Sequence, residues 1–330
     1  MGRRHRVLLY TLDDKSDVAR AYLAERGLAD QFDLVLKTHD SIGFPEASLL
    51  DGVEALVGDM VPVDAGQAHL LASKGVRLYA AMSVGVNHLD LAALDREGVL
   101  ASFCPGYCAE DVALHAFALM LDLMRQVTVS NRDVRAGLWD PYLHQEMHRP
   151  QGQVLGLVFL GNIARRLVPL AKALGMDVVA WAPTKTAAEV AEEGATKVDT
   201  LDELLMRSDV VSLHCPLVPE TEGLIGAREL ALMKPTAFLV NTSRGPVVDE
   251  EALADALEAG TIQGAALDVL ADEREGHRNR RLIDDPRCVV TPHSGFATAE
   301  SCEALMRMCM ESVVEVLVEG REPTHACHAR

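Results

Sequence analysis

The 330-residue sequence has no Cys-x-x-Cys pair, no excess of positive charge and no long uninterrupted hydrophobic run. Its seven cysteines are scattered, which argues against a disulfide framework or a zinc knuckle and favours the reducing cytoplasm. Acidic residues outnumber basic ones by 49 to 31, and the resulting net charge of −18 repels nucleic-acid phosphates and anionic lipid. No apolar stretch reaches the length of a membrane span, and the short run VLLY near the N-terminus is too brief for a signal peptide. These absences predict a cytoplasmic protein that binds neither nucleic acid nor membranes.

Short apolar runs alternate with longer helical patterns along the chain, which is the order typical of parallel α/β sheets. Four strands are predicted in the first hundred residues, and a second series of seven begins near residue 154. The first series is 6–11, 33–37, 54–58 and 76–82. The second series is 154–160, 176–182, 195–198, 209–214, 236–242, 263–269 and 287–293. The length and the restart of the pattern predict two doubly wound domains.

Two long helices and a tail complete the expected organisation. Apolar residues at helical spacing predict a mostly buried helix over 108–127. A second amphipathic helix is predicted over 298–320, where Gly320 stops it, and the last ten residues are interpreted as a solvated tail. No internal repeat is present.

Polar residues stand at the ends of the last predicted strands, where ligands bind in open α/β sheets. They are Arg244 in NTSRG, Asp268 and Glu273 in ALDVLADE, and His293 in TPHSG. An arginine, a carboxylate and a histidine together suit a reaction that places negative charge on a carbonyl oxygen, because that oxygen needs a cation and a proton.

These residues lie in segments that resemble the D-isomer-specific 2-hydroxyacid dehydrogenase family over nearly the whole chain. The densest similarity is in MKPTAFLVNTSRGPVVDEEALADALEAGTIQGAALDV and in SLHCPLVPETEGLIG before it. The spacing of 24 residues from Arg244 to Asp268, and of 5 from Asp268 to Glu273, also fits the family. The resemblance implies an enzyme that interconverts a small 2-keto acid and a D-2-hydroxy acid by hydride transfer from NAD or NADP.

The resemblance also implies roles for individual residues. His293 corresponds to the general acid, Glu273 to the carboxylate that pairs with it and favours imidazolium, and Arg244 to the guanidinium that grips the substrate carboxylate and carbonyl. The backbone NH groups of Ser83, Val84 and Gly85 match the loop that receives the substrate carboxylate, so that catalysis would need closure of one domain on the other. The implied cofactor-binding residues are Gly161, Asn162, Ile163, Cys215, Pro216, Thr221, Thr242, Ser243, Arg244, Asp268 and His293.

The family's architecture implies a discontinuous substrate domain with the cofactor domain inserted into it. The expected boundaries are residues 1–103 for the first part of the substrate domain, 104–296 for the cofactor domain and 297–330 for the returning helix. By the same analogy we expect a homodimer formed through the cofactor domain.

The cofactor site departs from the family pattern at several positions. In GLVFLGNIARRL the three positions of G-x-G-x-x-G hold Phe159, Gly161 and Ala164, so a bulky side chain stands where the first glycine makes the tight turn. Ala182 replaces the aspartate that binds the ribose hydroxyls in NAD-preferring relatives. Phe103 and Leu114 replace two further family residues, an asparagine and an acid. These changes leave the choice between NAD and NADP open.

Two alternative functions from other classes stay open. One is a dinucleotide-sensing scaffold or corepressor of the C-terminal-binding-protein type, and the other is a keto-acid binder of reduced catalytic power. The retained Arg244, Glu273 and His293 favour the enzyme, because a binding protein needs no paired acid and base. No metal site is expected: HQEMH (His144 and His148) lacks the second-position glutamate of the zincin motif, and HACH lies in the tail.

Overall fold

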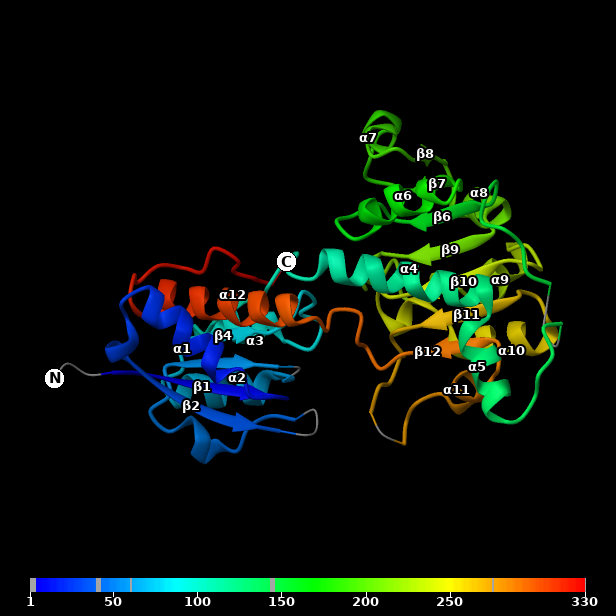
Figure 1. Ribbon diagram of the computed structural model, residues 1–330. Helices are drawn as coiled ribbons and strands as arrows, with labels where there is room; N and C mark the ends of the chain where they lie inside the picture. The colour runs from blue at the N-terminus through cyan, green and yellow to red at the C-terminus, as the bar shows by residue number, and fades with distance from the viewer. Residues whose placement is uncertain (1–3, 40–42, 60, 143–145, 275, 330) are drawn as a thin grey trace. The chain divides into compact units, whose positions relative to one another are not determined.

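The structure, a computed structural model, describes residues 4–39, 43–59, 61–142, 146–274 and 276–329. The chain divides into two compact units, Met1–Tyr107 with Thr298–Arg330 (unit 1) and Cys108–Ala297 (unit 2). Each unit is built on one parallel sheet (Figure 1). The prediction of two doubly wound α/β sheets is confirmed.

Unit 1 contains a five-stranded sheet in the order β2-β1-β3-β4-β5. Its strands are β1 (His5–Thr11), β2 (Phe32–Thr38), β3 (Ala55–Gly58), β4 (Leu78–Ala81) and β5 (Leu100–Ser102). Its helices are α1 (Ser16–Glu25), α2 (Ala65–Ser73), α3 (Leu91–Glu97) and α12 (Ala299–Leu317), with short 3-10 helices at Ala29–Gln31 and Ala47–Leu50.

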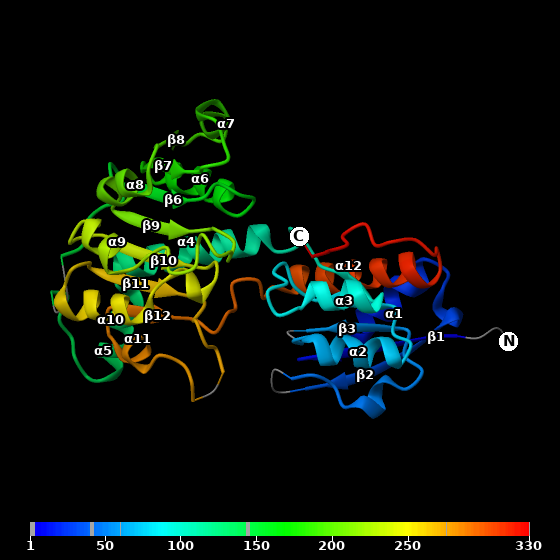
Figure 2. The same ribbon diagram turned by 180° about the vertical axis from the view of Figure 1, so that it is seen from behind.

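Alternation along β1 assigns helices to the two faces of this sheet. Val7 and Leu9 pack with α1 and α12 on one face, which is the nearer one in Figure 1. Leu8 and Tyr10 pack with α2 and α3 on the other face, seen in Figure 2. Both faces are covered, which is why the strands read as nearly continuous apolar runs.

Unit 2 contains a seven-stranded sheet in the order β12-β11-β10-β9-β6-β7-β8. Its strands are β6 (Val154–Val158), β7 (Asp177–Trp181), β8 (Thr196–Lys197), β9 (Val210–Leu213), β10 (Phe238–Asn241), β11 (Gly264–Leu267) and β12 (Cys288–Val290). Its helices are α4 (Ala109–Arg125), α5 (Val127–Arg135), α6 (Ala164–Ala173), α7 (Ala187–Glu192), α8 (Leu201–Arg207), α9 (Ala227–Leu232), α10 (Glu250–Ala259) and α11 (Arg280–Asp284), with a 3-10 helix at Gly245–Val247.

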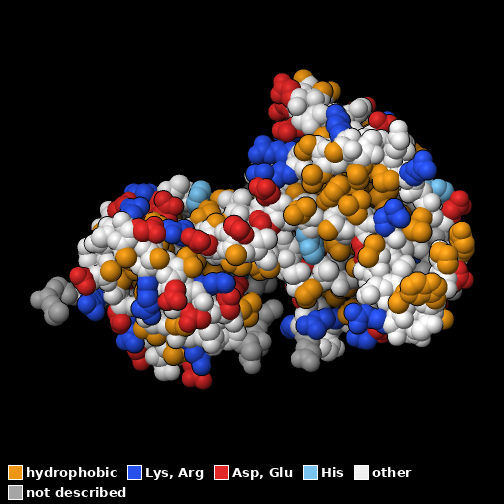
Figure 3. Space-filling view, in the orientation of Figure 1, with side chains coloured by type: hydrophobic (Ala, Val, Ile, Leu, Met, Phe, Trp, Pro, Cys, Tyr) orange, Lys and Arg blue, Asp and Glu red, His pale blue; other side chains and the backbone are white. Residues whose placement is uncertain are grey.

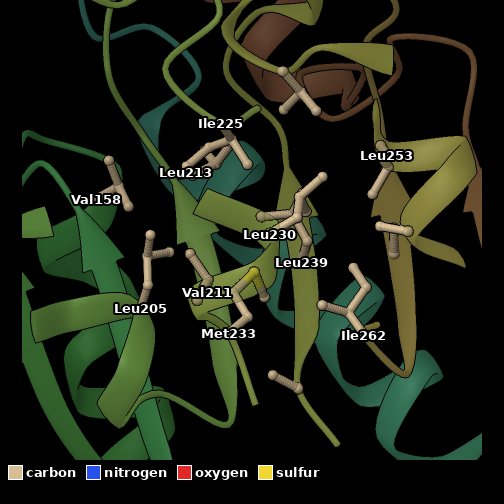
Figure 4. Close-up of a cluster of buried hydrophobic side chains, with 14 of the residues drawn as sticks. Val158, Leu205, Val211, Leu213, Ile225, Leu230, Met233, Leu239, Leu253 and Ile262 are labelled. Atoms are coloured by element: carbon tan, nitrogen blue, oxygen red, sulfur yellow. The ribbon is translucent and has the colours of Figure 1, made fainter. Parts of the chain in front are cut away.

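Two apolar cores sandwich this second sheet. Figure 4 shows the core under α8, α9 and α10, where Val211, Leu213 and Leu239 of the strands meet Leu230 and Leu253 of the helices. The opposite core lies beneath α4 and α6 and is likewise made of fully buried aliphatic side chains. Burial of this kind stabilises the unit by ~25 cal/mol per Å² of apolar surface removed from water.

Three features differ from the sequence predictions. The short edge strand β5 was not expected, and the long helix ends at Arg125, because Gln126 adopts a φ of 53° before α5 begins. The tail is not merely solvated, so that prediction is wrong. Ala326 pairs antiparallel with Ser102, and Cys327 N donates to Ala101 O at 2.9 Å, so the tail covers the exposed edge of β5.

Within the described ranges, no single helix is long and apolar enough to cross a membrane. Only α4 and α5 taken together, bent by 60° at Gln126, meet the criteria of length and composition.

Candidate active site

The predicted cofactor and catalytic residues of unit 2 follow the carboxyl ends of its strands. Gly161–Ile163 come after β6, Cys215 and Pro216 after β9, and Thr242–Arg244 after β10. Asp268 follows β11 and His293 follows β12. Because all seven strands are parallel, these ends lie along one edge of the sheet (Figure 1). The chain leaves β6 in one direction and β9 in the other, so this edge contains the topological switch point where ligands bind in such sheets.

The turn after β6 keeps a glycine-like conformation although it contains Phe159. The φ of Phe159 is 70°, in the left-handed region that glycine adopts readily and other residues avoid. Its backbone NH donates to Trp181 O at 2.9 Å, and its half-buried ring meets the Trp181 ring edge-on with centroids 5.6 Å apart. The ring is therefore housed against β7 while the backbone makes the tight turn.

The surroundings of this turn fit a dinucleotide. A Cβ built on Gly161 would meet no atom within 4 Å, so the backbone faces open space there. Helix α6 begins three residues later, and no side chain caps its N-terminus, which leaves backbone NH groups for a phosphate. Thr242, 8% exposed, has a buried Oγ1 without a hydrogen-bond partner in the described part of the chain, as expected of a group that awaits a ligand.

The loop between β9 and α9 is held by its own hydrogen bonds. The Thr221 hydroxyl donates to Pro216 O at 2.6 Å and accepts from Val218 N at 3.0 Å, so Thr221 shapes the loop. Burial raises the pKa of the Cys215 thiol to about 11, which keeps it a neutral, unreactive group beside this loop. His214 Nε2 lies 2.9 Å from Ser212 Oγ, and burial lowers the pKa of His214 to about 4.

Arg244 is placed by a compact turn after β10. Asn241 holds the turn, because its Nδ2 donates to Arg244 O at 3.0 Å and its Oδ1 accepts from Ser243 N at 3.0 Å. The Arg244 guanidinium donates through Nη1 to Ser243 O at 2.7 Å. Next to it, a Cβ on Gly245 would clash with the carbonyl carbon of Leu270, so only glycine lets the two loops touch.

His293 and Glu273 form the pair that the sequence predicted. His293 Nδ1 lies 3.0 Å from Glu273 Oε2, and Leu270 N donates to Glu273 Oε1 at 3.4 Å, which orients the carboxylate. The two side chains are 32% and 29% exposed, so a small substrate can reach them. No hydrogen bond within the described chain engages the other ring nitrogen, Nε2, which leaves it for a substrate. His293 has a φ of 53°, a conformation that costs ~1–3 kcal/mol and recurs at functional sites.

Asp268 lies beneath the loop that carries His293. Its carboxylate is 3% exposed and accepts hydrogen bonds from Ser294 N and Gly295 N, each at 2.9 Å. Burial by itself raises the pKa of this carboxyl, but the hydrogen bonds of His115, Thr291 and the loop amides outweigh burial and hold the pKa below its ordinary value. Asp268 is therefore an anion that anchors the loop from within.

The predicted substrate loop belongs to unit 1 and follows β4. Ser83 Oγ donates to Gly85 O at 2.8 Å, and Ser83 O accepts from Cys104 N at 2.9 Å, so the loop has a defined shape. Val84 is 43% exposed at its centre.

Sequence reasoning missed His115 on α4, which the structure brings to Asp268 and Thr291. The only signal in the sequence was a histidine next to the apolar stripe of a helix. Elsewhere, the described residues contain no cluster of three His, Cys, Asp or Glu side chains fit to hold a metal. His144 of HQEMH lies outside the described residues, and His148 is exposed.

Comparison with known proteins identifies the family. The profile described as D-isomer specific 2-hydroxyacid dehydrogenase, NAD binding domain, matches residues 117–295. The chain belongs to the D-isomer specific 2-hydroxyacid dehydrogenase family. A member of this family is an oxidoreductase, and the matched domain binds a nicotinamide dinucleotide.

Three relatives illustrate the match. Glyoxylate reductase of Thermococcus litoralis is 36% identical over 245 residues, which are 72% of this chain and 73% of the relative. The TT0316 protein of Thermus thermophilus superposes with a TM-score of 0.82 at 36% identity, covering 97% of this chain and 99% of that one. D-3-phosphoglycerate dehydrogenase of Synechocystis is 34% identical over 280 residues, 84% of this chain, but this chain spans only 50% of that relative's length.

Proposed function

We propose that this dehydrogenase interconverts a small 2-keto acid and the corresponding D-2-hydroxy acid. The observation that carries the proposal is the His293–Glu273 pair, 3.0 Å apart at a strand end of the dinucleotide-binding unit, with the Arg244 turn beside it through Gly245. A histidine paired with a carboxylate can donate and accept a proton near neutral pH, and an arginine binds a carboxylate through two parallel hydrogen bonds.

Each side chain has one task in this reaction. A nicotinamide dinucleotide, when bound, would supply or accept the hydride. Arg244 binds the substrate carboxylate and polarises the carbonyl. In the reductive direction His293 would donate the proton on Nε2 to the carbonyl oxygen, and in the oxidative direction it would take that proton back. Glu273, bound to Nδ1, stabilises the imidazolium form and fixes the ring.

The same unit is proposed to accept NADP as well as NAD. Ala182 directly follows β7 and offers no carboxylate to repel a 2′-phosphate. Lys185 lies one turn further, and its carbonyl oxygen accepts a hydrogen bond from Lys197 Nζ at 2.5 Å, which holds the Lys197 ammonium beside this turn. Both lysines also act on the nearby Glu189 carboxylate, so a 2′-phosphate would share their positive charge with Glu189.

The test is a spectrophotometric assay with glyoxylate, hydroxypyruvate and pyruvate, each with NADH and with NADPH. Oxidation of the cofactor by at least one keto acid, lost in the His293→Ala variant, supports the proposal. Tight NADH binding by calorimetry without turnover of any keto acid would overturn it in favour of a dinucleotide-sensing scaffold. Keto-acid binding without turnover would indicate the weakened binder.

We also propose a homodimer in the cytoplasm, formed through α4, α5 and the segment that follows them. Seven of the eleven exposed large hydrophobic side chains of the described residues lie between positions 114 and 147, including Trp139 at 87% and Tyr142 at 89%. Figure 3 shows hydrophobic side chains gathered over this face of unit 2. An apolar cavity of about 630 Å³ adjoins it, lined by Leu123, Val129 and Val289 among others.

Sedimentation velocity tests the dimer. Trp139→Glu should convert it to a monomer, because a charge buried in an apolar interface costs several kcal/mol. Met206→Glu, on α8 and 53% exposed, is the matched control and should leave the mass unchanged. A wild-type monomer at micromolar concentration contradicts the proposal.

A further inference from the structure

His115 connects α4 to the loop that carries His293. Its Nε2 lies 3.0 Å from Thr291 Oγ1 and 3.2 Å from Asp268 Oδ1. The Thr291 hydroxyl donates to Asp268 Oδ1 at 2.5 Å, so its oxygen is left to accept. The Nε2 of His115 is therefore the protonated nitrogen, and its N–H serves both Thr291 and Asp268.

The groups that His115 contacts hold His293 on both sides. Thr291 lies two residues before it, and the amides of Ser294 and Gly295, after it, both donate to the Asp268 carboxylate at 2.9 Å. His293 N itself donates to Asp268 O at 2.8 Å. Contacts to one aspartate thus surround the left-handed backbone at His293. Among the described residues that make these bonds, His115 is the only one on a helix.

The His115 ring also packs on the backbone of this loop. A Cβ on Gly295 would lie 3.3 Å from His115 Cδ2 and 2.9 Å from Asp268 Oδ2. Glycine at position 295 therefore permits the loop to settle against the imidazole. The hydrogen bonds and this contact are independent constraints on the same segment.

We propose that His115 is a positioning residue that holds the His293 loop in its catalytic conformation through Thr291 and Asp268. The inference rests on the proposed role of His293 in keto-acid reduction. His115 does not act on the substrate. It completes the hydrogen bonding of a buried carboxylate and closes the side of the loop that faces α4.

Two variants separate the N–H donor from the bulk of the ring. His115→Phe keeps a flat ring and removes the donor, whereas His115→Gln returns an N–H at the end of a side chain of similar reach. With glyoxylate or hydroxypyruvate and NADH, we expect kcat to fall roughly tenfold to a hundredfold in the Phe variant, the scale of a misplaced catalytic group. The Gln variant should recover most of this loss, and in both variants the dissociation constant for NADH should change less than about threefold.

A double variant tests whether His115 acts through His293. In the His293→Ala background the acid is already absent, so adding His115→Phe should reduce kcat no further. A full additional loss, or an equal kcat in wild type and His115→Phe, overturns the proposal. His69→Phe, on α2 with a side chain 72% exposed, is the matched control and should retain wild-type kcat.

Hydrogen–deuterium exchange provides a readout that needs no activity. The amides of Ser294 and Gly295 should exchange at least about tenfold faster in His115→Phe than in wild type. The reason is that the Asp268 carboxylate, which accepts from both amides, loses its hydrogen bond from His115. Faster exchange in a protein that reduces no keto acid would show that the positioning holds and the proposed function fails. Unchanged exchange in His115→Phe would overturn the positioning itself. If that variant does not fold, Thr291→Val removes the bridging hydroxyl and carries the same expectations.

Discussion

Replacing Phe159 by glycine and by alanine should reveal the strain in the turn after β6. Both substitutions remove the same half-buried ring and its edge-on contact with Trp181, at a cost of ~2 kcal/mol. Alanine keeps a Cβ at a φ of 70°, and so keeps a conformational penalty of ~1–2 kcal/mol. Glycine removes that penalty but gives the unfolded chain ~0.5–1 kcal/mol more backbone entropy.

The balance makes the glycine variant more stable than the alanine variant by ~0.5–1 kcal/mol, while both are less stable than wild type. Urea unfolding followed by circular dichroism measures the difference. Asn162, three residues away and without a positive φ, is the matched control, and there alanine should be the more stable of the two. An alanine variant at position 159 as stable as the glycine variant would refute the left-handed turn.

The same variants address the cofactor. If the ring holds the turn away from the pyrophosphate, one charge-assisted hydrogen bond of ~1.5–3 kcal/mol is poorly made, which weakens binding roughly tenfold to a hundredfold. Phe159→Gly should then bind NADH more tightly than wild type in titration calorimetry. Equal or tighter binding by wild type would show that the ring is accommodated against β7 without loss.

Three further predictions concern single side chains. His293→Ala should lower turnover at least about a hundredfold while glyoxylate still binds, and near-normal turnover would reject His293 as the acid. Lys185→Ala should weaken NADPH roughly tenfold and leave NADH unaffected, as measured by calorimetry with both cofactors; equal effects would mean that Lys185 points elsewhere. Burial lowers the pKa of His214 from 6.5 to about 4. Between these two pH values His214 is protonated in the unfolded chain and neutral in the folded one. Stability is therefore fully present above pH 6.5 and should fall by ~1.5 kcal/mol between pH 6.5 and 5, a loss that His214→Asn abolishes in urea titrations.

Much of the fold could be predicted because parallel strands are buried on both faces. All seven strands of unit 2 were expected, since each is a short apolar run between helices. β5 escaped because it has only three residues, Leu100–Ser102, too few for any pattern. The tail was misjudged because its polar side chains conceal a backbone that pairs with Ser102.

The site residues could be predicted only where reactive side chains stand close together in the sequence, at the ends of predicted strands. Glu273 and His293 are 20 residues apart at successive strand ends, and the fold pairs them as expected. His115 is 176 residues from Thr291, and that contact depends on how α4 crosses the strand ends, which no local pattern encodes. Steric repulsion of the Cβ also argues against a left-handed phenylalanine, and the turn overrides it at Phe159.

Strain in unit 2 is concentrated where ligands are expected. Among the described residues only Gln126, Phe159 and His293 combine a side chain with a positive φ, and the last two follow strands at the carboxyl edge of the sheet. Such conformations persist only when their surroundings over-determine them. At His293 the bonds to Asp268 and the carboxylate of Glu273 do so, and at Phe159 the Trp181 carbonyl and ring do. The two loops therefore depend on contacts with residues outside them. A substitution at Trp181 should weaken cofactor binding, and one at His115 should slow catalysis, with a smaller effect on the stability of the fold in both cases.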